Sequence, residues 1–315
     1  MTHPDTRLGA SDVLAAADRI RGVVRRTPLL AVNSLPAVLL KAEHLQLGGS
    51  FKARGAANAL LAGNARAVVA GSSGNHGIAL ATLGRRLGVE VTVVMAAGAS
   101  TAKAATLRSL GAEVLQVPGG VVERDRYARE HAARTGAALI PSSDHDLVVA
   151  GQSTVGLEVF TDAPETDLIF VPTGGGGLLA GICLAAMCLA TPVRIVGVEP
   201  AHGRRYAHSL AAARPVELPL PDTIADGLRG QRPGAVPFPI IRHRVDELIG
   251  VTDEAISSAM NLLHGAGIAA EPTGSVALAG VLQFGAAGRA VAVISGGNIP
   301  ATLSASHRAT SALAH

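Results

Sequence analysis

The hydrophobic pattern divides much of the chain into short apolar runs that alternate with alanine-rich amphipathic stretches. Alternation of this kind is typical of βαβ units, in which helices join parallel strands and cover the sheet. A first series of apolar runs predicts strands at residues 67–70, 89–95, 112–117 and 137–140. A second series predicts strands at residues 168–171, 194–198, 247–251 and 290–294. The pattern therefore predicts an α/β protein with mostly parallel sheets.

Amphipathic stretches predict the helices between these strands. In the first series they begin near His76, Ser100 and Val122, and in the second they cover residues 178–189 and 253–264. Residues 213–239 are rich in proline and have no clear period, so we interpret them as an ordered loop.

The order of the segments indicates how the domains are arranged. A lysine segment at residues 48–55 precedes the first series, and a run of four glycines follows it. We therefore expect a small α/β domain, residues 58–145, inserted into a larger domain made of residues 1–57 and 146–315. A ligand site is expected between the two.

Composition and charge exclude several classes of partner. Hydrophobic residues make up 48% of the chain, but aromatic residues only 2%, with no tryptophan, so platforms for stacking nucleic-acid bases are lacking. A scattered net charge of +3 is too small for a nucleic-acid footprint. No apolar stretch reaches membrane-spanning length, so we expect neither nucleic acid nor membrane as a partner.

The two cysteines, Cys183 and Cys188, lie in one apolar stretch and form no CxxC motif. No paired histidines or further cysteines complete a metal site with them. We interpret both as ordinary thiols and expect a reducing cytoplasmic location.

Lys52 occupies a position that disfavours a charged lysine. Ser50 is predicted to be the N-cap of a helix over residues 53–62, which places Lys52 in the first turn, where the helix dipole repels an ammonium group. A neutral amine, or an amine consumed as an imine, fits better there, and proteins anchor aldehyde cofactors in this way. Taken alone, the position is more typical of a solvated surface lysine, and the segments below change that balance.

Four glycines stand where a predicted strand ends and a helix begins: Gly174, Gly175, Gly176 and Gly177. Unhindered backbone N–H groups and a helix N-terminus predict an anion cradle there. The run also contains the spacing Gly175, Gly177, Ala180, and Glu199 ends the next predicted strand. A dinucleotide site therefore stays open as an alternative.

Two further polar segments follow predicted strands. One is Ser72-Ser73-Gly74-Asn75-His76, and the other is Ser295-Gly296-Gly297-Asn298. The carboxyl ends of parallel strands are where open α/β sheets bind ligands, so both segments are candidates for the same site.

With these residues, the chain resembles the serine/threonine dehydratase and serine racemase branch of the fold-type II enzymes that use pyridoxal 5'-phosphate (PLP). The resemblance covers almost the whole chain. It includes Arg25-Arg26-Thr27-Pro28-Leu29, Ser50-Phe51-Lys52, Ala150-Gly151-Gln152, Thr223-Ile224-Ala225-Asp226-Gly227 and Ser295-Gly296-Gly297-Asn298. It implies two open, twisted, mostly parallel sheet domains with helices on both faces.

The resemblance also implies a role for each site residue. Lys52 would form the Schiff base with PLP and remove the Cα proton of the substrate, with Phe51 beside the cofactor ring. Gly174, Gly175, Gly176 and Gly177 would hold the phosphate, Asn75 would bond the ring hydroxyl, and Ser295 would face the pyridine nitrogen. Gly227 would also line the cofactor. Ser72, Ser73, Gly74, Asn75 and His76 would bind the substrate carboxylate, and Ser73 would be the second proton donor in a racemase.

The chain departs from the family pattern at two places. One is Gly48, which opens the lysine motif where a threonine is usual, and the other follows Glu199. Many members bind a metal near a Glu-Pro segment with acidic residues downstream, whereas Glu199-Pro200 is followed here by Ala201-His202-Gly203-Arg204-Arg205. We therefore expect no metal ion in this protein.

We accordingly predict a PLP-dependent ammonia-lyase that converts a β-hydroxy amino acid, such as L-threonine or L-serine, to a 2-oxo acid and ammonia. A homodimer is expected. Serine racemase is the nearest alternative, and an NAD-binding oxidoreductase and a non-catalytic small-molecule sensor are more distant ones.

Overall fold

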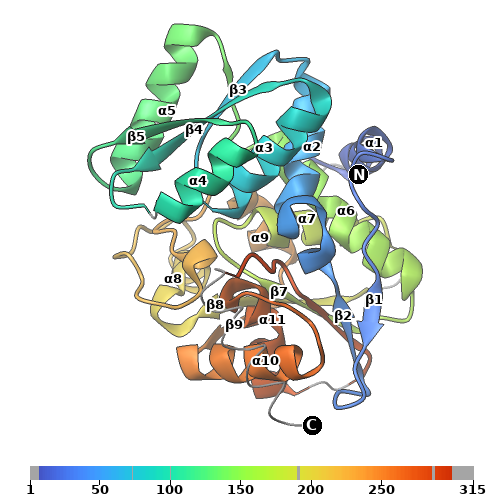
Figure 1. Ribbon diagram of the computed structural model, residues 1–315. Helices are drawn as coiled ribbons and strands as arrows, with labels where there is room; N and C mark the ends of the chain where they lie inside the picture. The colour runs from blue at the N-terminus through green and yellow to red at the C-terminus, as the bar shows by residue number, and fades with distance from the viewer. Residues whose placement is uncertain (1–6, 73, 100, 190–191, 286–287, 300–315) are drawn as a thin grey trace.

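The computed structural model describes residues 7–72, 74–99, 101–189, 192–285 and 288–299, which form two β-sheets (Figure 1). The larger sheet has the strand order β1-β2-β10-β7-β8-β9, and all its pairings are parallel except β1 with β2. Its strands are β1 Leu29–Ala31, β2 Val38–Lys41, β7 Leu168–Pro172, β8 Arg194–Pro200, β9 Glu247–Val251 and β10 Ala290–Val293. The smaller sheet, β5-β4-β3-β6, is wholly parallel. Its strands are β3 Ala67–Gly71, β4 Glu90–Ala96, β5 Glu113–Val117 and β6 Ala138–Leu139.

Helices cover both faces of the larger sheet. Along β7, Ile169 and Val171 pack into one apolar cluster while Leu168 and Phe170 pack into the opposite one, as the two-residue period of a strand requires. The first cluster includes side chains of α6 Asp146–Asp162, α7 Gly177–Ala186 and α9 Pro237–Arg244. The second includes α10 Asp253–Gly265 and α11 Pro272–Phe284. Strands buried on both faces are continuously apolar, which is why β7, β8 and β10 are visible in the sequence.

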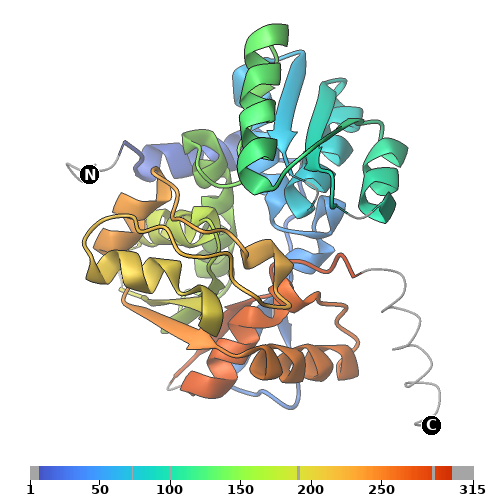
Figure 2. The same cartoon turned by 90° about the vertical axis from the view of Figure 1, so that its left-hand side faces the viewer.

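The smaller sheet is covered in the same way. Helices α2 Lys52–Gly63, α3 Asn75–Leu87 and α4 Thr101–Ser109 share one apolar cluster with β3 and β4. Helix α5 Val121–Thr135 packs on the other face. The two sheets lie one above the other in both views, and α2 and α6 pack together where they meet (Figures 1 and 2).

The remaining elements are short or peripheral. Helix α1 Ala10–Ile20 packs against α6, and α8 Arg205–Ala211 follows β8. Single 3-10 turns occupy Glu43–Leu45, Leu47–Gly49, Ala201–Gly203 and Asp226–Leu228. In the described ranges, no helix combines the length and the apolar character that crossing a membrane would require.

The predicted α/β architecture and all eight predicted strands are confirmed, with ends shifted by no more than two residues. The sequence pattern missed β1 and β2, and it missed the helices α1, α6, α8, α9 and α11. Helix α9 begins at Pro237, within the stretch 213–239 that was predicted as a loop. Helices α6 and α11 are buried over most of their surface, so they have no polar face to give a helical period. The proposed domain boundaries stay a prediction, and the one between residues 57 and 58 falls inside α2.

The prediction that Ser50 caps α2 is wrong. The N-cap is Phe51, and Ser50 is extended, with φ −162° and ψ 160°. Ser50 instead forms an isolated β-bridge with Gly296, and its buried hydroxyl has no hydrogen-bond partner among the described residues. Lys52 is nevertheless the first residue of α2, so it does lie at the positive end of the helix dipole.

Candidate active site

Lys52 is the first residue of α2 and is half-buried. Its Nζ donates a hydrogen bond to the carbonyl oxygen of Ser142 at 2.8 Å and lies 4.9 Å from the centre of the Phe51 ring. Burial lowers the pKa of Lys52 to about 8. A substantial fraction of the amine is therefore neutral near physiological pH, as a nucleophile or a base must be.

The four glycines form a turn between β7 and α7. Gly176 has φ +95°, and the N–H groups of Gly174, Gly175 and Gly176 make no hydrogen bond with any described residue. A Cβ on Gly175 would lie 2.2 Å from the Ser143 hydroxyl oxygen, so a side chain would clash there. Free N–H groups at the N-terminus of a ten-residue helix suit a phosphate group.

Residues 142–143 join the lysine to the glycine run. The Ser142 carbonyl accepts the bond from Lys52, and Ser143 adjoins the positions that Cβ atoms would take on Gly175 and Gly177. No sequence motif marked this segment as part of a site. Its one local signal was its place directly after a predicted strand, at residues 137–140.

Asn75 is fixed through both ends of its side-chain amide. Its Nδ2 donates to Glu271 Oε1 at 2.5 Å, and its Oδ1 accepts from Asn298 Nδ2 at 2.8 Å. Asn298 Nδ2 also donates to the carbonyl oxygen of Gly48, which precedes the lysine. Burial raises the pKa of Glu271 to about 7. Glu271 was missed too, although a Glu directly before a Pro is a helix-start signal, and Pro272 does begin α11.

Ser295 lies against the lysine segment from the C-terminal end of β10. Its carbonyl accepts from the Phe51 N–H at 3.0 Å, and its hydroxyl donates to the carbonyl of Thr273 at 3.4 Å. The hydroxyl of Thr273 in turn accepts from the Gly227 N–H at 3.1 Å. Ser295 and Gly227 are thus linked through Thr273.

His76 is buried, with 2% of its surface exposed. Its Nε2 lies 2.8 Å from the Ile140 carbonyl, and because a carbonyl only accepts, Nε2 carries the proton. Burial, followed by the charge of Lys52, lowers the pKa of His76 to about 3, so the ring is neutral. Ser72 and Gly74 stand at the start of α3, while Ser73 lies outside the described residues.

Glu199 does not face a ligand. It is fully buried, and its two carboxylate oxygens accept from the N–H groups of Tyr206 at 2.9 Å and Ala207 at 3.1 Å. A dinucleotide site needs this carboxylate free for a ribose, so the geometry argues against that interpretation. Within the described ranges, no cluster of three or more His, Cys, Asp or Glu residues is arranged to hold a metal ion.

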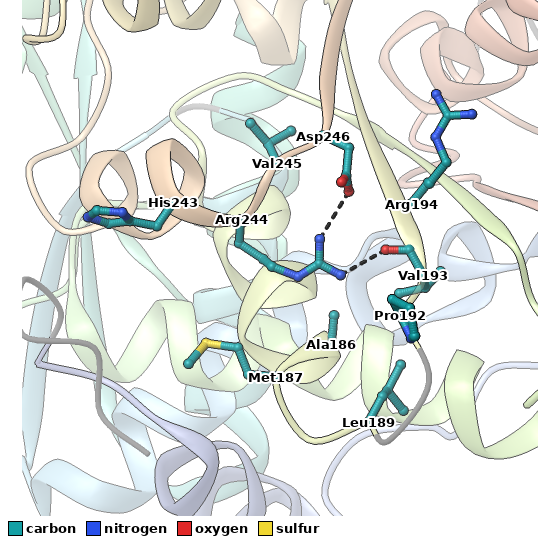
Figure 3. Close-up of a pocket in the computed structure, with 10 residues that line it drawn as sticks. All are labelled: Ala186, Met187, Leu189, Pro192, Val193, Arg194, His243, Arg244, Val245 and Asp246. Carbon is teal, nitrogen blue, oxygen red and sulfur yellow. Dashed lines mark hydrogen bonds and ion pairs between the residues drawn. The ribbon is translucent and has the colours of Figure 1, made fainter.

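A hollow at the end of α7 is separate from these residues (Figure 3). Arg244 lines it and donates hydrogen bonds to the Val193 carbonyl at 2.7 Å and to Asp246 at 3.0 Å. None of its ten lining residues is a predicted site residue: Ala186, Met187, Leu189, Pro192, Val193, Arg194, His243, Arg244, Val245 and Asp246.

The residues that do converge fit PLP. The amine of Lys52 can react with its aldehyde, the glycine run offers N–H donors to its phosphate, and Asn75 and Ser295 supply uncharged polar groups. Lys52 and the glycine run meet at residues 142–143, and Ser295 contacts the lysine segment through Phe51.

Comparison with known proteins gives matches over nearly the whole chain. The family model described as "Pyridoxal-phosphate dependent enzyme" matches residues 20–296. The L-threo-3-hydroxyaspartate ammonia-lyase of Saccharomyces cerevisiae is 38% identical over 301 residues, which cover 91% of this chain and 92% of that protein.

Two solved structures are similar. The T.th. threonine deaminase has a TM-score of 0.88 and 40% identity, and the match covers 93% of this chain and 99% of that one. Maize serine racemase has a TM-score of 0.90 and 31% identity, with coverage of 98% and 99%.

Proposed function

Since the chain belongs to the family of pyridoxal-phosphate dependent enzymes, we propose that it is an ammonia-lyase acting on a β-hydroxy amino acid such as L-threonine or L-serine. Family membership confirms the resemblance drawn from the sequence motifs, and with it PLP as the cofactor. The products are a 2-oxo acid and ammonia.

The similar proteins support this substrate class. By their names, they act on L-threo-3-hydroxyaspartate, threonine and serine. These three compounds are all amino acids with a hydroxyl group on Cβ. A β-hydroxyl is the group that an eliminating enzyme expels, so it is the feature we expect the substrate to need.

The residues of the chain divide the work between binding and proton transfer. Bound PLP supplies an electron sink that acidifies the Cα–H bond of the amino acid. The N–H groups of Gly174, Gly175 and Gly176 hold the phosphate, while Asn75 and Ser295 orient the ring through uncharged groups. Lys52 takes the Cα proton, which its lowered pKa suits it to do.

The overall reaction balances without an oxidant or a reductant. The Cα proton and the β-hydroxyl leave as water, and hydrolysis then returns one water to give the 2-oxo acid and ammonium. The proposal rests on one observation: the amine of Lys52 is hydrogen-bonded to Ser142, and the next residue, Ser143, lies against the glycine run.

The test is an assay of 2-oxo acid release by the purified PLP-loaded enzyme from L-serine, L-threonine and L-threo-3-hydroxyaspartate. We expect release from at least one of them and none from L-alanine, which lacks the hydroxyl. Absence of 2-oxo acid from all three would overturn the lyase proposal.

Serine racemase is the second candidate, favoured by the similarity to the maize racemase over 98% of this chain. Formation of D-serine from L-serine at a rate above that of 2-oxo acid release would support it. A sensor without catalysis is disfavoured, because the lysine and the cradle are both in place.

Assembly as a homodimer is part of the proposal, as is the reducing cytoplasmic location. For the location, the support is chemical: Cys183 and Cys188 are both free thiols. For the dimer it is the general preference of soluble enzymes for two-fold assemblies.

A further inference from the structure

The geometry points to Tyr206 as a positioning residue that aims the backbone N–H of Gly176 at the cofactor phosphate. The inference rests on the glycine run being the phosphate site. It assigns a function to a side chain that touches only the outer side of that run.

Tyr206 holds the peptide group between Gly175 and Gly176. Its hydroxyl donates to the carbonyl oxygen of Gly175 at 2.9 Å, and the N–H of Gly234 approaches the same oxygen at 3.3 Å. A trans peptide is planar, and its C=O and N–H bonds point in opposite directions. With the Gly175 oxygen fixed toward Tyr206, the Gly176 N–H must point away from Tyr206.

The opposite side of this peptide is the inner side of the site. A Cβ on Gly176 would collide with the Tyr206 hydroxyl, whereas Cβ atoms on Gly175 and Gly177 would meet Ser143. Ser143 follows Ser142, whose carbonyl holds the amine of Lys52. The Gly176 N–H is therefore presented on the side where the lysine lies, and in the described structure it has no other acceptor.

A peptide group between two glycines needs a hydrogen bond of this kind to fix its orientation. Without Cβ atoms, both residues adopt positive and negative φ at little cost, and Gly176 is already at φ +95°. Rotation of this peptide would replace the donor in the cradle by a carbonyl oxygen, which repels phosphate. Tyr206 opposes that rotation because its hydroxyl would lose its partner.

Tyr206 is itself rigidly mounted. It is fully buried, and Glu199 accepts hydrogen bonds from its N–H and from that of Ala207. Burial raises the pKa of the phenol, which therefore stays protonated and able to donate. The adjacent Arg205, also fully buried, donates to the carbonyl of Leu228, whose side chain would lie 3.0 Å from a Cβ on Gly174. Two neighbouring side chains thus support the glycine run from outside.

The test compares PLP with pyridoxal, which has the aldehyde and ring but no phosphate, on the apoprotein. In Tyr206→Phe, loss of one hydrogen bond should weaken the affinity for PLP about 3- to 10-fold and leave the affinity for pyridoxal unchanged. Tyr127→Phe is the matched control, since Tyr127 is the other tyrosine of the chain and lies on α5, in the cluster of the smaller sheet. That control should bind both compounds as the wild type does.

Three outcomes overturn the inference. If Gly175→Asp binds PLP much more weakly than the wild type but Tyr206→Phe binds it equally well, the role of Tyr206 is rejected. The glycine run then remains the phosphate site. Unchanged PLP affinity in Gly175→Asp rejects the glycine run as the phosphate site, and it rejects the role of Tyr206 as well. A parallel loss of PLP affinity, pyridoxal affinity and thermal stability in Tyr206→Phe would make Tyr206 a residue of the core only.

Discussion

The amine of Lys52 lies 2.8 Å from the carbonyl oxygen of Ser142, although the two residues are 90 positions apart in the chain. Lys52 begins α2, and Ser142 follows β6, the last strand of the smaller sheet. The next residue, Ser143, adjoins the glycine run that follows β7 of the larger sheet. The site is therefore completed by a segment that leaves one sheet and meets the other.

Lys52 should carry the cofactor. Borohydride reduction of the PLP-loaded enzyme followed by peptide mapping is expected to give a pyridoxyl adduct on Lys52, and Lys52→Ala should abolish 2-oxo acid release. The chain has two other lysines: Lys41 is paired with Glu158 and Lys103 with Asp226. An adduct on either of these would reject the assignment.

The rate at which the apoprotein takes up PLP should depend on pH through Lys52. Only the neutral amine attacks an aldehyde, so the rate is expected to rise as Lys52 loses its proton and to level off above a midpoint of about 8. Stopped-flow absorbance across the pH range measures this midpoint. A midpoint near 10.5, the ordinary lysine value, would show that burial does not lower the pKa of Lys52.

Replacing Glu43 should destabilise the protein strongly. Arg54 is fully buried and donates two hydrogen bonds to Glu43, at 2.7 and 2.8 Å. Glu158 also pairs with Arg54, and it pairs with the buried Lys41 as well. Glu43→Gln therefore leaves two buried cations to share one carboxylate, and we expect a loss of about 3–5 kcal/mol in the free energy of unfolding. Urea denaturation measures the loss.

The control for this substitution is Glu130→Gln on α5. Glu130 pairs with Arg126 at the surface, so we expect its replacement to change the free energy of unfolding far less than Glu43→Gln does. Equal effects of the two substitutions would contradict a structural role for the buried pair.

We expect Ser73 to distinguish lyase activity from racemase activity. It lies outside the described residues, and the prediction rests on the family resemblance. Ser73→Ala should remove a proton donor needed for D-serine formation while leaving Lys52 to start elimination, so 2-oxo acid release should survive in part. If both activities and the melting temperature fall together, the two-face scheme is wrong.

Activity should not depend on a divalent cation. The segment after Glu199-Pro200 carries Arg204 and Arg205 in place of acidic residues, and the guanidinium of Arg205 is fully buried there. We expect EDTA to leave the rate of 2-oxo acid release unchanged, and added magnesium or calcium likewise. A loss with EDTA that either ion restores would contradict this.

The sequence by itself determined the eight principal strands, the glycine run and the lysine. Each of these is a local property. A strand buried on both faces is apolar throughout, and four successive glycines indicate a turn by themselves. A lysine in the first turn of a helix faces the positive end of the helix dipole. Short-range patterns of this kind are complete within a few residues.

The tertiary structure decided which of these segments meet and what holds them. Glu271 and Asn75 are 196 positions apart and share a hydrogen bond, and Tyr206 reaches Gly175 over 31 positions. Neither contact has a local signature, because the sequence spacing between two elements says nothing of the distance between them after folding. Helices α6 and α11 were not predicted for a related reason. Protein covers most of their surface, so their sequences lack the polar face that gives an amphipathic period.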